Sequence, residues 1–565
     1  SFNTAVGHSA GSAVTTGTNN TFIGGLSGDA VTTGTESVAL GSNSLSANTE
    51  GTANTALGAY ALRNDTLGSR SVAVGHQALN AQNFTTATSA YNVAVGANAG
   101  VSVTTGTLNT LIGGLAGDAI TTGGYNTATG YAAGSGLTTG VENTIAGALA
   151  GTALTDADYN VAMGVQALAA DTKGSKSTAI GTQTLFSQNF TTSYDVFNVA
   201  VGYQAGRVIT TGTQNTLIGG LAGDALTATD YNTAVGYGAL SLDTLGARNT
   251  AVGHEALGSQ NFTTATTSYN TAVGMQAGRL ITTGKDNTLI GGLTGDAITT
   301  GEYNTAVGRS ALSSETLGNR SVAIGYASLS KSNFTTDTDT YNTAIGMQSG
   351  KELLTGVNNT CLGGLAGGAI TTGDSNVFVG RDAGDTTTTG SKNICIGQNA
   401  NANNSGQENA IVIGHDITGT GNDFSFGKAS NIVSNDFDTD ANWSRSSDQR
   451  LKKNIADSTL GLSFINALRP VKYNWKPSHE LDSSDSQLAH LYKSDPADNE
   501  MNTEATMYNF IAQEVKSALD AAGVSDFGGW KEDHWGVQQV SREMFVIPLV
   551  KAVQELTARI EALES

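Results

Sequence analysis

A repeating unit of 17 residues constrains this chain more than any other feature. The unit begins with a segment of the form N-T-A-V-G, as in Asn232 to Gly236 and Asn304 to Gly308. Its closing glycine recurs 24 times, at positions 7, 24, 41, 58, 75, 96, 113, 130, 147, 164, 181, 202, 219, 236, 253, 274, 291, 308, 325, 346, 363, 380, 397 and 414. Four steps are 21 residues long because they carry an insert: 75–96, 181–202, 253–274 and 325–346. Such a period indicates a stack of similar structural units.

The pattern within each unit predicts a β-solenoid over residues 1–414. In N-T-A-V-G the first and third residues face one way, and the second and fourth face the other way, as in a strand. A second short segment follows, such as YQAG or HQAL, and then a T-T-G turn. We interpret this as two strands and two turns per coil. The density of glycine and β-branched residues excludes helices. At about 4.8 Å per coil, 24 coils make a rod about 115 Å long.

Asparagine occupies the first position of the segment in 19 copies, and serine occupies it in four. Stacked coils would align these side chains in a ladder, with each amide bonded to its neighbours. Cys361 and Cys395 share one position in two repeats, which favours small core residues over a disulfide or a metal pair.

The composition excludes several classes of function. The net charge is −20 and there is no basic stripe, so we expect no nucleic-acid binding. No apolar run approaches 18 residues, so we expect no membrane insertion. The chain starts inside a repeat, so we expect it to be a fragment. No motif indicates a cofactor.

Two motifs in the repeats suggest sites that we consider doubtful. The segment GGLAGDAI (113–120) has its glycine and aspartate one place away from the calcium-binding pattern G-G-x-G-x-D. N-F-T sequons occur at Asn83, Asn189, Asn261 and Asn333. They belong to the inserts and are interpreted as surface turns.

The segments SVAVG (71–75) and SVAIG (321–325) resemble the head repeats of trimeric autotransporter adhesins. The 17-residue period is longer than the period of that family. The resemblance implies a three-chain β-roll and names no ligand.

The composition changes after the repeats. Residues 415–446 are predicted to be a polar connector, and 447–565 a small α+β domain. In this domain, STLGLSFINALRP is predicted to be a helix with Ser458 as N-cap and Pro470 as stop. VKYNWK is predicted to be a strand, 478–502 a loop, and YNFIAQEVKSALDAAG a strand followed by a helix with Gly523 as C-cap. Leu549, Val553, Leu556, Ile560 and Leu563 form a coiled-coil seam in the last segment, about 546–565.

Four blocks in order carry a second resemblance: SDQRLKKNI (447–455), LRPVKYNWK (468–476), FIAQEV (510–515) and PLVKAVQEL (548–556). Together they resemble the C-terminal intramolecular chaperone domain of phage tail spikes and fibres, of the endosialidase type. Asn509 departs from this pattern, where glycine is common. The resemblance implies a domain that assembles a homotrimer and then cuts itself off. It implies a Ser-Lys dyad at Ser447 and Lys452.

The chemistry of these residues is consistent with that assignment. A serine hydroxyl needs a base to become a nucleophile, and a neutral lysine amine can serve. Neutrality requires desolvation or nearby positive charge, which Arg450 and Lys453 could supply. Attack by the Ser447 hydroxyl on the carbonyl of Ser446 passes through a five-membered ring, which favours cleavage between Ser446 and Ser447. The alternative is that Lys452 is a solvated charge in a linker.

The sequence therefore predicts a structural fibre or spike protein of a phage tail, made in the host cytoplasm and carried in the virion. Its expected partners are two more copies of the chain, other tail proteins, and a host surface receptor or glycan. Alternatives are a polysaccharide-degrading tailspike or a bacterial trimeric surface adhesin. Degradation would need paired carboxylates, and the rod offers only scattered acids such as Asp118, Glu142 and Asp230.

Overall fold

The structure is a computed structural model that describes residues 2–436, 444–445, 447–499, 501, 503–504 and 506–565. The chain divides into two compact units, Ser1–Ser446 and Ser447–Ser565. Among the described residues, no helix has both the length and the hydropathy needed to cross a lipid bilayer.

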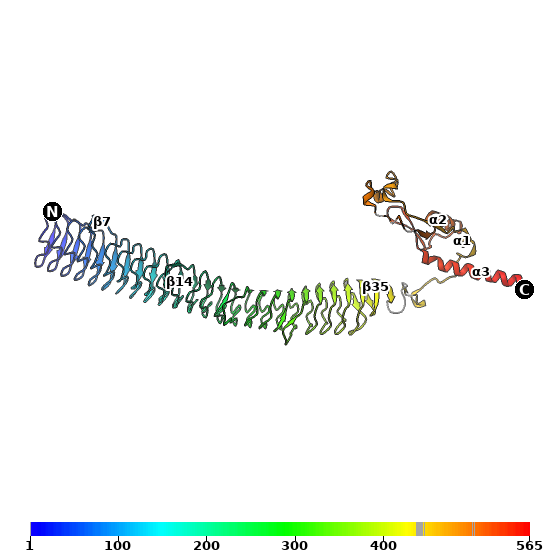
Figure 1. Cartoon of the computed structure of the whole chain (residues 1–565), viewed down its shortest axis with the longest axis horizontal. Helices are drawn as coiled ribbons and strands as arrows, with labels where there is room; N and C mark the ends of the chain where they lie inside the picture. The colour runs from blue at the N-terminus through cyan, green and yellow to red at the C-terminus, as the bar shows by residue number, and fades with distance from the viewer. Residues whose placement is uncertain (1, 437–443, 446, 500, 502, 505) are drawn as a thin grey trace. The chain divides into compact units, whose positions relative to one another are not determined.

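The first unit is a β-solenoid in which every coil contributes one short strand to a continuous parallel sheet (Figure 1). The register links equivalent residues of successive coils, as in Thr233↔Thr250 and Val235↔Val252. The coil strands are β1 (Thr4–Val6), β2 (Thr21–Ile23), β3 (Val38–Leu40), β4 (Thr55–Leu57), β6 (Val72–Val74), β8 (Val93–Val95), β9 (Thr110–Ile112), β10 (Thr127–Thr129), β11 (Thr144–Ala146), β12 (Val161–Met163), β14 (Thr178–Ile180), β16 (Val199–Val201), β17 (Thr216–Ile218), β18 (Thr233–Val235), β20 (Thr250–Val252), β22 (Thr271–Val273), β23 (Thr288–Ile290), β24 (Thr305–Val307), β26 (Val322–Ile324), β28 (Thr343–Ile345), β29 (Thr360–Leu362), β30 (Val377–Val379), β31 (Ile394–Ile396) and β33 (Ile411–His415). The predicted β-solenoid fold is therefore confirmed.

The structure shows which side of each strand faces the core. In β18 the middle residue, Ala234, is fully buried, while Thr233 and Val235 are half-buried on the outer face. The first and third residues of N-T-A-V-G thus point inward, and the threonine and the large aliphatic residue point outward. Cys361 and Cys395 hold the inward Ala position and are free thiols. Burial raises the pKa of each thiol to about 12, so both behave as inert core residues.

The buried asparagines form the predicted ladder, but they bond mainly to backbone. The Oδ1 atom of Asn109 accepts the N–H of Asn126 in the next coil at 3.0 Å, and its Nδ2 donates to the carbonyl of Gly123 at 2.9 Å. Each amide thereby satisfies backbone groups that no strand reaches. Side-chain to side-chain bonds are a minor addition, as between Asn143 Nδ2 and Asn126 Oδ1 at 3.1 Å.

The prediction of two strands in every coil is wrong. The segment after the closing glycine is a series of turns, in which residues such as Gln204 and Gln276 take a left-handed φ of 57° and 55°. Closely spaced left-handed residues cannot form a strand. Short second pairings occur at five places: β5 (Gly68–Ser69) with β7 (Thr88–Ser89), β13 (Gly174–Ser175) with β15 (Tyr194–Asp195), β19 (Gly246–Ala247) with β21 (Thr266–Thr267), β25 (Gly318–Asn319) with β27 (Thr338–Asp339), and β32 (Asn401–Ala402) with β34 (Thr418–Gly419).

A buried carboxylate anchors each insert. Asp65 stands at a position where many other coils have Val, Ile or Leu. Its Oδ1 accepts the backbone N–H of Gly68 at 3.0 Å and that of Phe84 at 3.2 Å, and its Oδ2 accepts Nε2 of Gln82 at 2.8 Å. The same arrangement recurs at the other inserts with the pairs Asp171 and Gln188, Asp243 and Gln260, and Glu315 and Ser332.

The sheet continues beyond the repeats into the predicted connector. β35 (Asp423–Lys428) adds parallel to β33, β36 (Asn431–Asp436) turns back antiparallel to β35, and β37 (Ser444–Arg445) pairs antiparallel with β36. Residues 415–436 are therefore mostly ordered sheet rather than a polar linker, because the alternation in DFSFGK (423–428) suits a strand.

The second unit is a small α+β domain. Its elements are η1 (Gln449–Leu451), α1 (Leu462–Ala467), β38 (Val471–Tyr473), η2 (Ser478–Glu480), η3 (Ala489–Leu491), η4 (Pro496–Asp498), β39 (Met507–Asn509), α2 (Ala512–Ala521), β40 (Trp530–Glu532), β41 (Gln538–Val540), η5 (Arg542–Phe545) and α3 (Val546–Glu564). β38 pairs antiparallel with β39, and β40 with β41. The core gathers around Phe545, whose ring lies 5.0 Å from that of Phe510 and 5.2 Å from that of Phe527.

Two helix caps differ from the prediction. α1 begins at Leu462 rather than after Ser458, and its first N–H is bonded by Oε2 of Glu555 on α3 at 2.9 Å. A carboxylate from another element thus replaces the local N-cap. α2 has Ala522 as its C-cap, and Gly523 follows it with φ 69°.

Candidate functional site: a serine and a lysine at the start of the second unit

A single 3₁₀ turn brings Ser447 and Lys452 together. Nζ of Lys452 donates a hydrogen bond to Oγ of Ser447 at 2.7 Å. Asp448 caps the turn by accepting the N–H of Arg450 at 2.8 Å, and the N–H of Lys452 closes the turn on the carbonyl of Gln449. A tight turn therefore allows side chains five positions apart to meet. This distance is short enough for direct proton transfer from the hydroxyl to a neutral amine.

Arg450, which could supply positive charge to the site, is bound by Asp448. Nε and Nη2 of Arg450 donate to the Asp448 carboxylate at 3.0 and 2.6 Å. This side-chain hydrogen bond is the main cause that lowers the pKa of Asp448 below its usual value. The guanidinium charge is thereby neutralised locally.

The pair is open to solvent in the single chain. Ser447 and Lys452 are both exposed, and two large apolar side chains nearby are also exposed: Leu451 at 66% and Ile455 at 64%. Water stabilises a lysine ammonium, whereas a base must be neutral. Ser446, the other residue of the predicted cleavage site, lies outside the described residues.

Residues 447–524 match the family Peptidase_S74, chaperone of endosialidase. The match begins at Ser447 and includes the blocks SDQRLKKNI, LRPVKYNWK and FIAQEV, while PLVKAVQEL lies beyond it. A comparison with curated proteins found no match to the chain. A β-solenoid followed in the chain by an endosialidase-type chaperone domain fits a protein of the tail-fibre or tail-spike type. The family implies a chaperone domain that cleaves itself.

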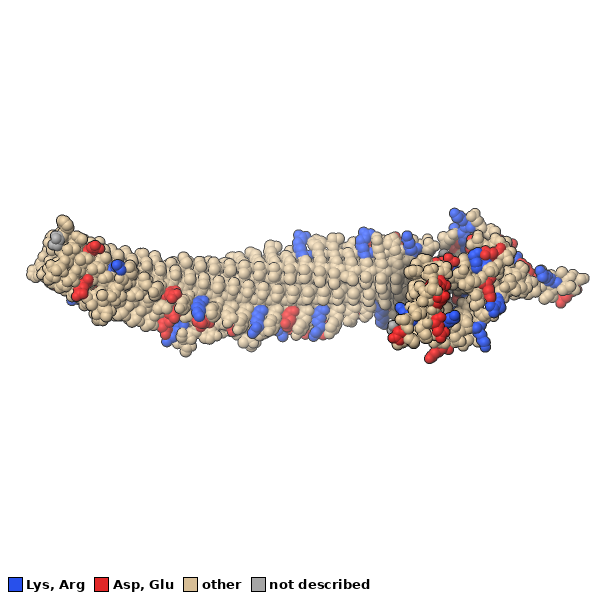
Figure 2. All heavy atoms as spheres, turned by 90° about the horizontal axis from the view of Figure 1, so that it is seen from above, with Lys and Arg blue, Asp and Glu red and all other residues tan. Residues whose placement is uncertain are grey.

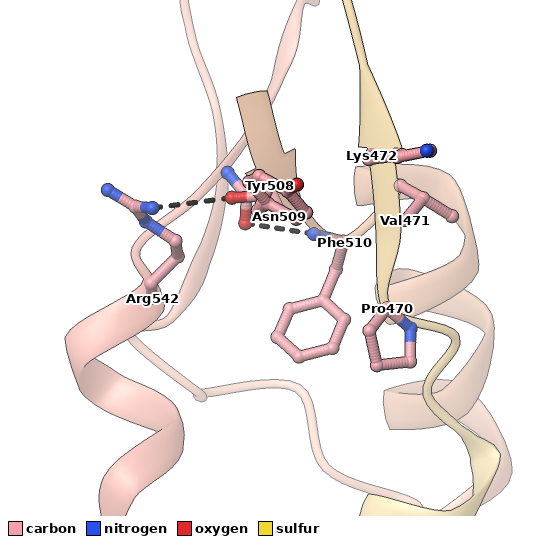
Figure 3. Close-up of a pocket in the computed structure, with 7 residues that line it drawn as sticks. All are labelled: Pro470, Val471, Lys472, Tyr508, Asn509, Phe510 and Arg542. Atoms are coloured by element: carbon pink, nitrogen blue, oxygen red, sulfur yellow. Dashed lines mark hydrogen bonds between the residues drawn. The ribbon is translucent and has the colours of Figure 1, made fainter. Parts of the chain in front are cut away.

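A hollow of about 540 Å³ lies between residues of two matched blocks and their neighbours (Figure 3). Pro470, Val471, Lys472, Tyr508, Asn509, Phe510 and Arg542 line it. Nη1 of Arg542 donates to the carbonyl of Tyr508 at 3.3 Å, and the N–H of Phe510 donates to Oδ1 of Asn509 at 2.9 Å. The first bond joins β39 to the 3₁₀ turn η5, and the second links adjacent residues at the end of β39. The lining offers no serine, cysteine or threonine nucleophile, so we assign the hollow a structural role.

The rod carries a polar hollow of about 560 Å³ that sequence reasoning missed. Thr283, Thr300, Glu302, Tyr303, Asn319, Arg320, Asp337 and Asp339 line it. Its carboxylates are already engaged: Asp339 accepts from Arg320 at 2.8 Å, Asp337 accepts from Asn319 at 2.6 Å, and Glu302 lies 3.3 Å from Lys285. The contacts of Asp337 and Asp339 tie the fourth insert to the preceding coil.

Different coils of the rod carry the acids considered for degradation: Asp118, Glu142 and Asp230. Asp230 accepts the backbone N–H and the hydroxyl of Thr213 in the preceding coil, at 2.7 and 3.0 Å. Within the described part of the chain, no three His, Cys, Asp or Glu side chains are grouped to hold a metal ion. Asp118, in the segment that resembles a calcium motif, therefore has no such companions among the described residues.

Proposed function

We propose that this chain is part of a trimeric phage tail fibre or spike whose second unit assembles three chains and then severs itself next to Ser447. The observation that supports this most directly is the 2.7 Å contact between Lys452 Nζ and Ser447 Oγ at the start of the family match. The rod would be the permanent product, and the second unit an assembly device that is released. In this proposal the rod is carried in the virion, with other tail proteins and a host surface receptor or glycan as partners.

The proposed cleavage uses atoms of the chain and one water molecule. Neutral Nζ of Lys452 takes the proton of the Ser447 hydroxyl, and Oγ attacks the carbonyl carbon of Ser446. The C–N bond between the two residues breaks, and the new amine of Ser447 takes the proton back from Nζ. The acyl group of Ser446 is then held as an ester on Oγ, and water hydrolyses that ester. Hydrolysis restores the hydroxyl and leaves a carboxylate on Ser446.

We propose that assembly itself activates the lysine. Leu451 and Ile455, within three positions of Lys452 in the sequence, expose two large apolar side chains. If a neighbouring protomer covers them, Lys452 loses water and its neutral form is favoured. Cleavage would then follow trimer formation rather than precede it.

Helix α3 supplies a surface for bringing three chains together. Its seam is exposed, with Leu549 at 50%, Val553 at 54% and Ile560 at 53%. About two heptads are too short to hold chains alone, so α3 would add to other contacts. A rod of near-identical coils can align one coil out of step at little cost, and an early trimeriser would fix the register.

Intact-mass measurement of the expressed protein tests this proposal. The wild type should split into pieces of 446 and 119 residues, which together make the 565 of the chain. Ser447→Ala should stay whole, because the variant has no nucleophile. Ser446→Ala is the matched control and should still be cut. A wild-type trimer that stays whole, or a Ser447→Ala variant that is cut, would contradict the proposal.

A further inference from the structure

One face of the solenoid is formed by uncharged side chains along its whole length. It consists of the first and third residues of every coil strand from β1 to β33, and we call it the strand face. At those positions the sequence has only Thr, Val, Ile, Leu, Met and Ala. In the single chain this face is open, with Ile218 at 39%, Ile290 at 40% and Leu362 at 43% exposure. Elsewhere charges do occur on the rod, and in the view of Figure 2 they lie mainly along its margins.

This strand face is large enough for a stable interface. Coils about 4.8 Å apart make it about 115 Å long, and its two residue columns make it about 7 Å wide. The resulting area, about 800 Å², is what each partner contributes to a standard protein interface.

The repeat indicates which partner fits the strand face. A partner must present matching rows about every 4.8 Å over two dozen coils, and another copy of this chain does so. Three copies can turn such faces toward one common axis, where the Thr and Val rows of their coils meet at the same spacing. A covering lipid or an irregular protein surface would not match this spacing.

We infer that the rods of the trimer associate through this strand face as three finished solenoids, not as interwound chains. The inference rests on the trimer of the proposed function and adds its interface. Each protomer already encloses its own core, in which Leu217, Leu289 and Ala234 are fully buried. The Asn ladder also closes within one chain. Association therefore needs only the outer rows, and aligned inserts fix which coils meet.

Distances between protomers test the strand face without depending on cleavage. We would place one spin label at Val252→Cys, on the strand face, in full-length Ser447→Ala protein. The control carries the label at Leu242→Cys, a site that is 56% exposed and lies outside the strands. Cys361 and Cys395 are buried and stay unlabelled. Labels at 252 should lie closer to one another than labels at 242.

Shorter distances at 242 than at 252, in a protein of trimer mass, would overturn the inferred face while leaving the trimer intact. A monomeric Ser447→Ala protein would contradict the proposed function itself, and the inference with it. The mass of the sample therefore distinguishes the two failures.

Charge substitution gives a second readout. Ile218→Lys, Val235→Lys and Val252→Lys together place three unpaired charges in the interface. The matched control is Thr211→Lys, Ala228→Lys and Leu242→Lys, three sites away from the strands. The strand-face variant should need at least about tenfold more protein to form trimers by sedimentation, with its β-sheet circular dichroism retained. Trimerisation equal to the control, or loss of the sheet signal on dissociation, would overturn the inference.

Discussion

At the scale of residues, the proposed chemistry depends on whether Lys452 can give up its charge. The contact with Ser447 is short, yet both side chains are exposed in the single chain. Geometry alone therefore does not make the pair active. Leu451 and Ile455, close to Lys452 in the sequence, expose apolar side chains that assembly can cover.

Lys452→Arg tests the need for a neutral base. Arginine keeps the positive charge and a donor, but it does not lose its proton at ordinary pH. Proton transfer by a positioned base contributes about 10²–10⁴-fold to a rate. We expect self-cleavage to slow by at least about 10²-fold, measured as loss of the full-length chain with time. Cleavage at the wild-type rate would show that Lys452 is not the base.

The buried carboxylates at the inserts give a pH dependence. Burial is the largest cause that raises the pKa of Asp65 and Asp243, although hydrogen bonds from Gln82 and Gln260 oppose it. A pKa raised by folding means that the folded rod binds protons more tightly than the unfolded chain. This contribution to stability is fully present below the ordinary pKa of 3.8 and is lost as pH rises through the raised value.

The measurement is the urea midpoint of the rod between acidic and neutral pH, for wild type and Asp65→Asn. Subtracting the variant's profile removes the other acids. The difference should favour the wild type more at acidic pH than at neutral pH. A difference that grows with pH would contradict a raised pKa at Asp65. In Asp65→Asn, the side-chain NH₂ group can face Nε2 of Gln82, which sets two hydrogen-bond donors against each other. The variant should therefore be less stable than the wild type at low pH.

At the scale of elements, the sequence predicted what is periodic and local. The step of 17 or 21 residues located every coil strand, because each coil repeats its closing glycine and most coils repeat the buried Asn. The alternation did not show which face of the strand points inward. In N-T-A-V-G, both faces carry small or β-branched residues, so neither face is clearly the apolar one. The prediction of a second strand was wrong because residues in that segment take left-handed φ values. Glutamine rarely adopts this conformation, so the residue types at Gln204 and Gln276 gave no sign of it.

The site was predictable to the same extent. Five-residue spacing was compatible with contact between Ser447 and Lys452, and one 3₁₀ turn provides it. The role of Arg450 was not predictable, because Asp448 two residues before it captures the guanidinium. Similarly, Ser458 could not be excluded as a cap without knowing that Glu555 reaches α1 from 93 residues away.

Helix α3 is the element whose loss should stop assembly and cutting together. Val553→Asp puts a charge in the middle of the exposed seam, while Gln554→Asp puts the same charge beside it. A charge in the seam must be desolvated on association, which is costly. We expect Val553→Asp to stop both trimer formation and cleavage, and Gln554→Asp to change neither. Light scattering and intact mass follow the two events, and cleavage of a monomeric Val553→Asp protein would argue against their coupling.

At the scale of the whole molecule, the proposed function joins a rod that can align in several registers with a second unit that is released after assembly. Near-identical coils permit slipped alignments, and the four longer coils penalise most of them. In the proposed function, removing the second unit afterwards takes away the template for reassembly. The product would then be protected by a high unfolding barrier rather than by equilibrium.

The most direct test of the central claim is the dependence of cleavage on chain concentration. Unfolded full-length protein is diluted to a series of concentrations, and the 57.5 kDa chain and the trimer are followed together in time. The account predicts that cleavage lags behind trimer formation and nearly vanishes where chains stay monomeric. An equal cleavage rate across a wide range of concentration, or assembled trimers that persist uncut, would contradict it.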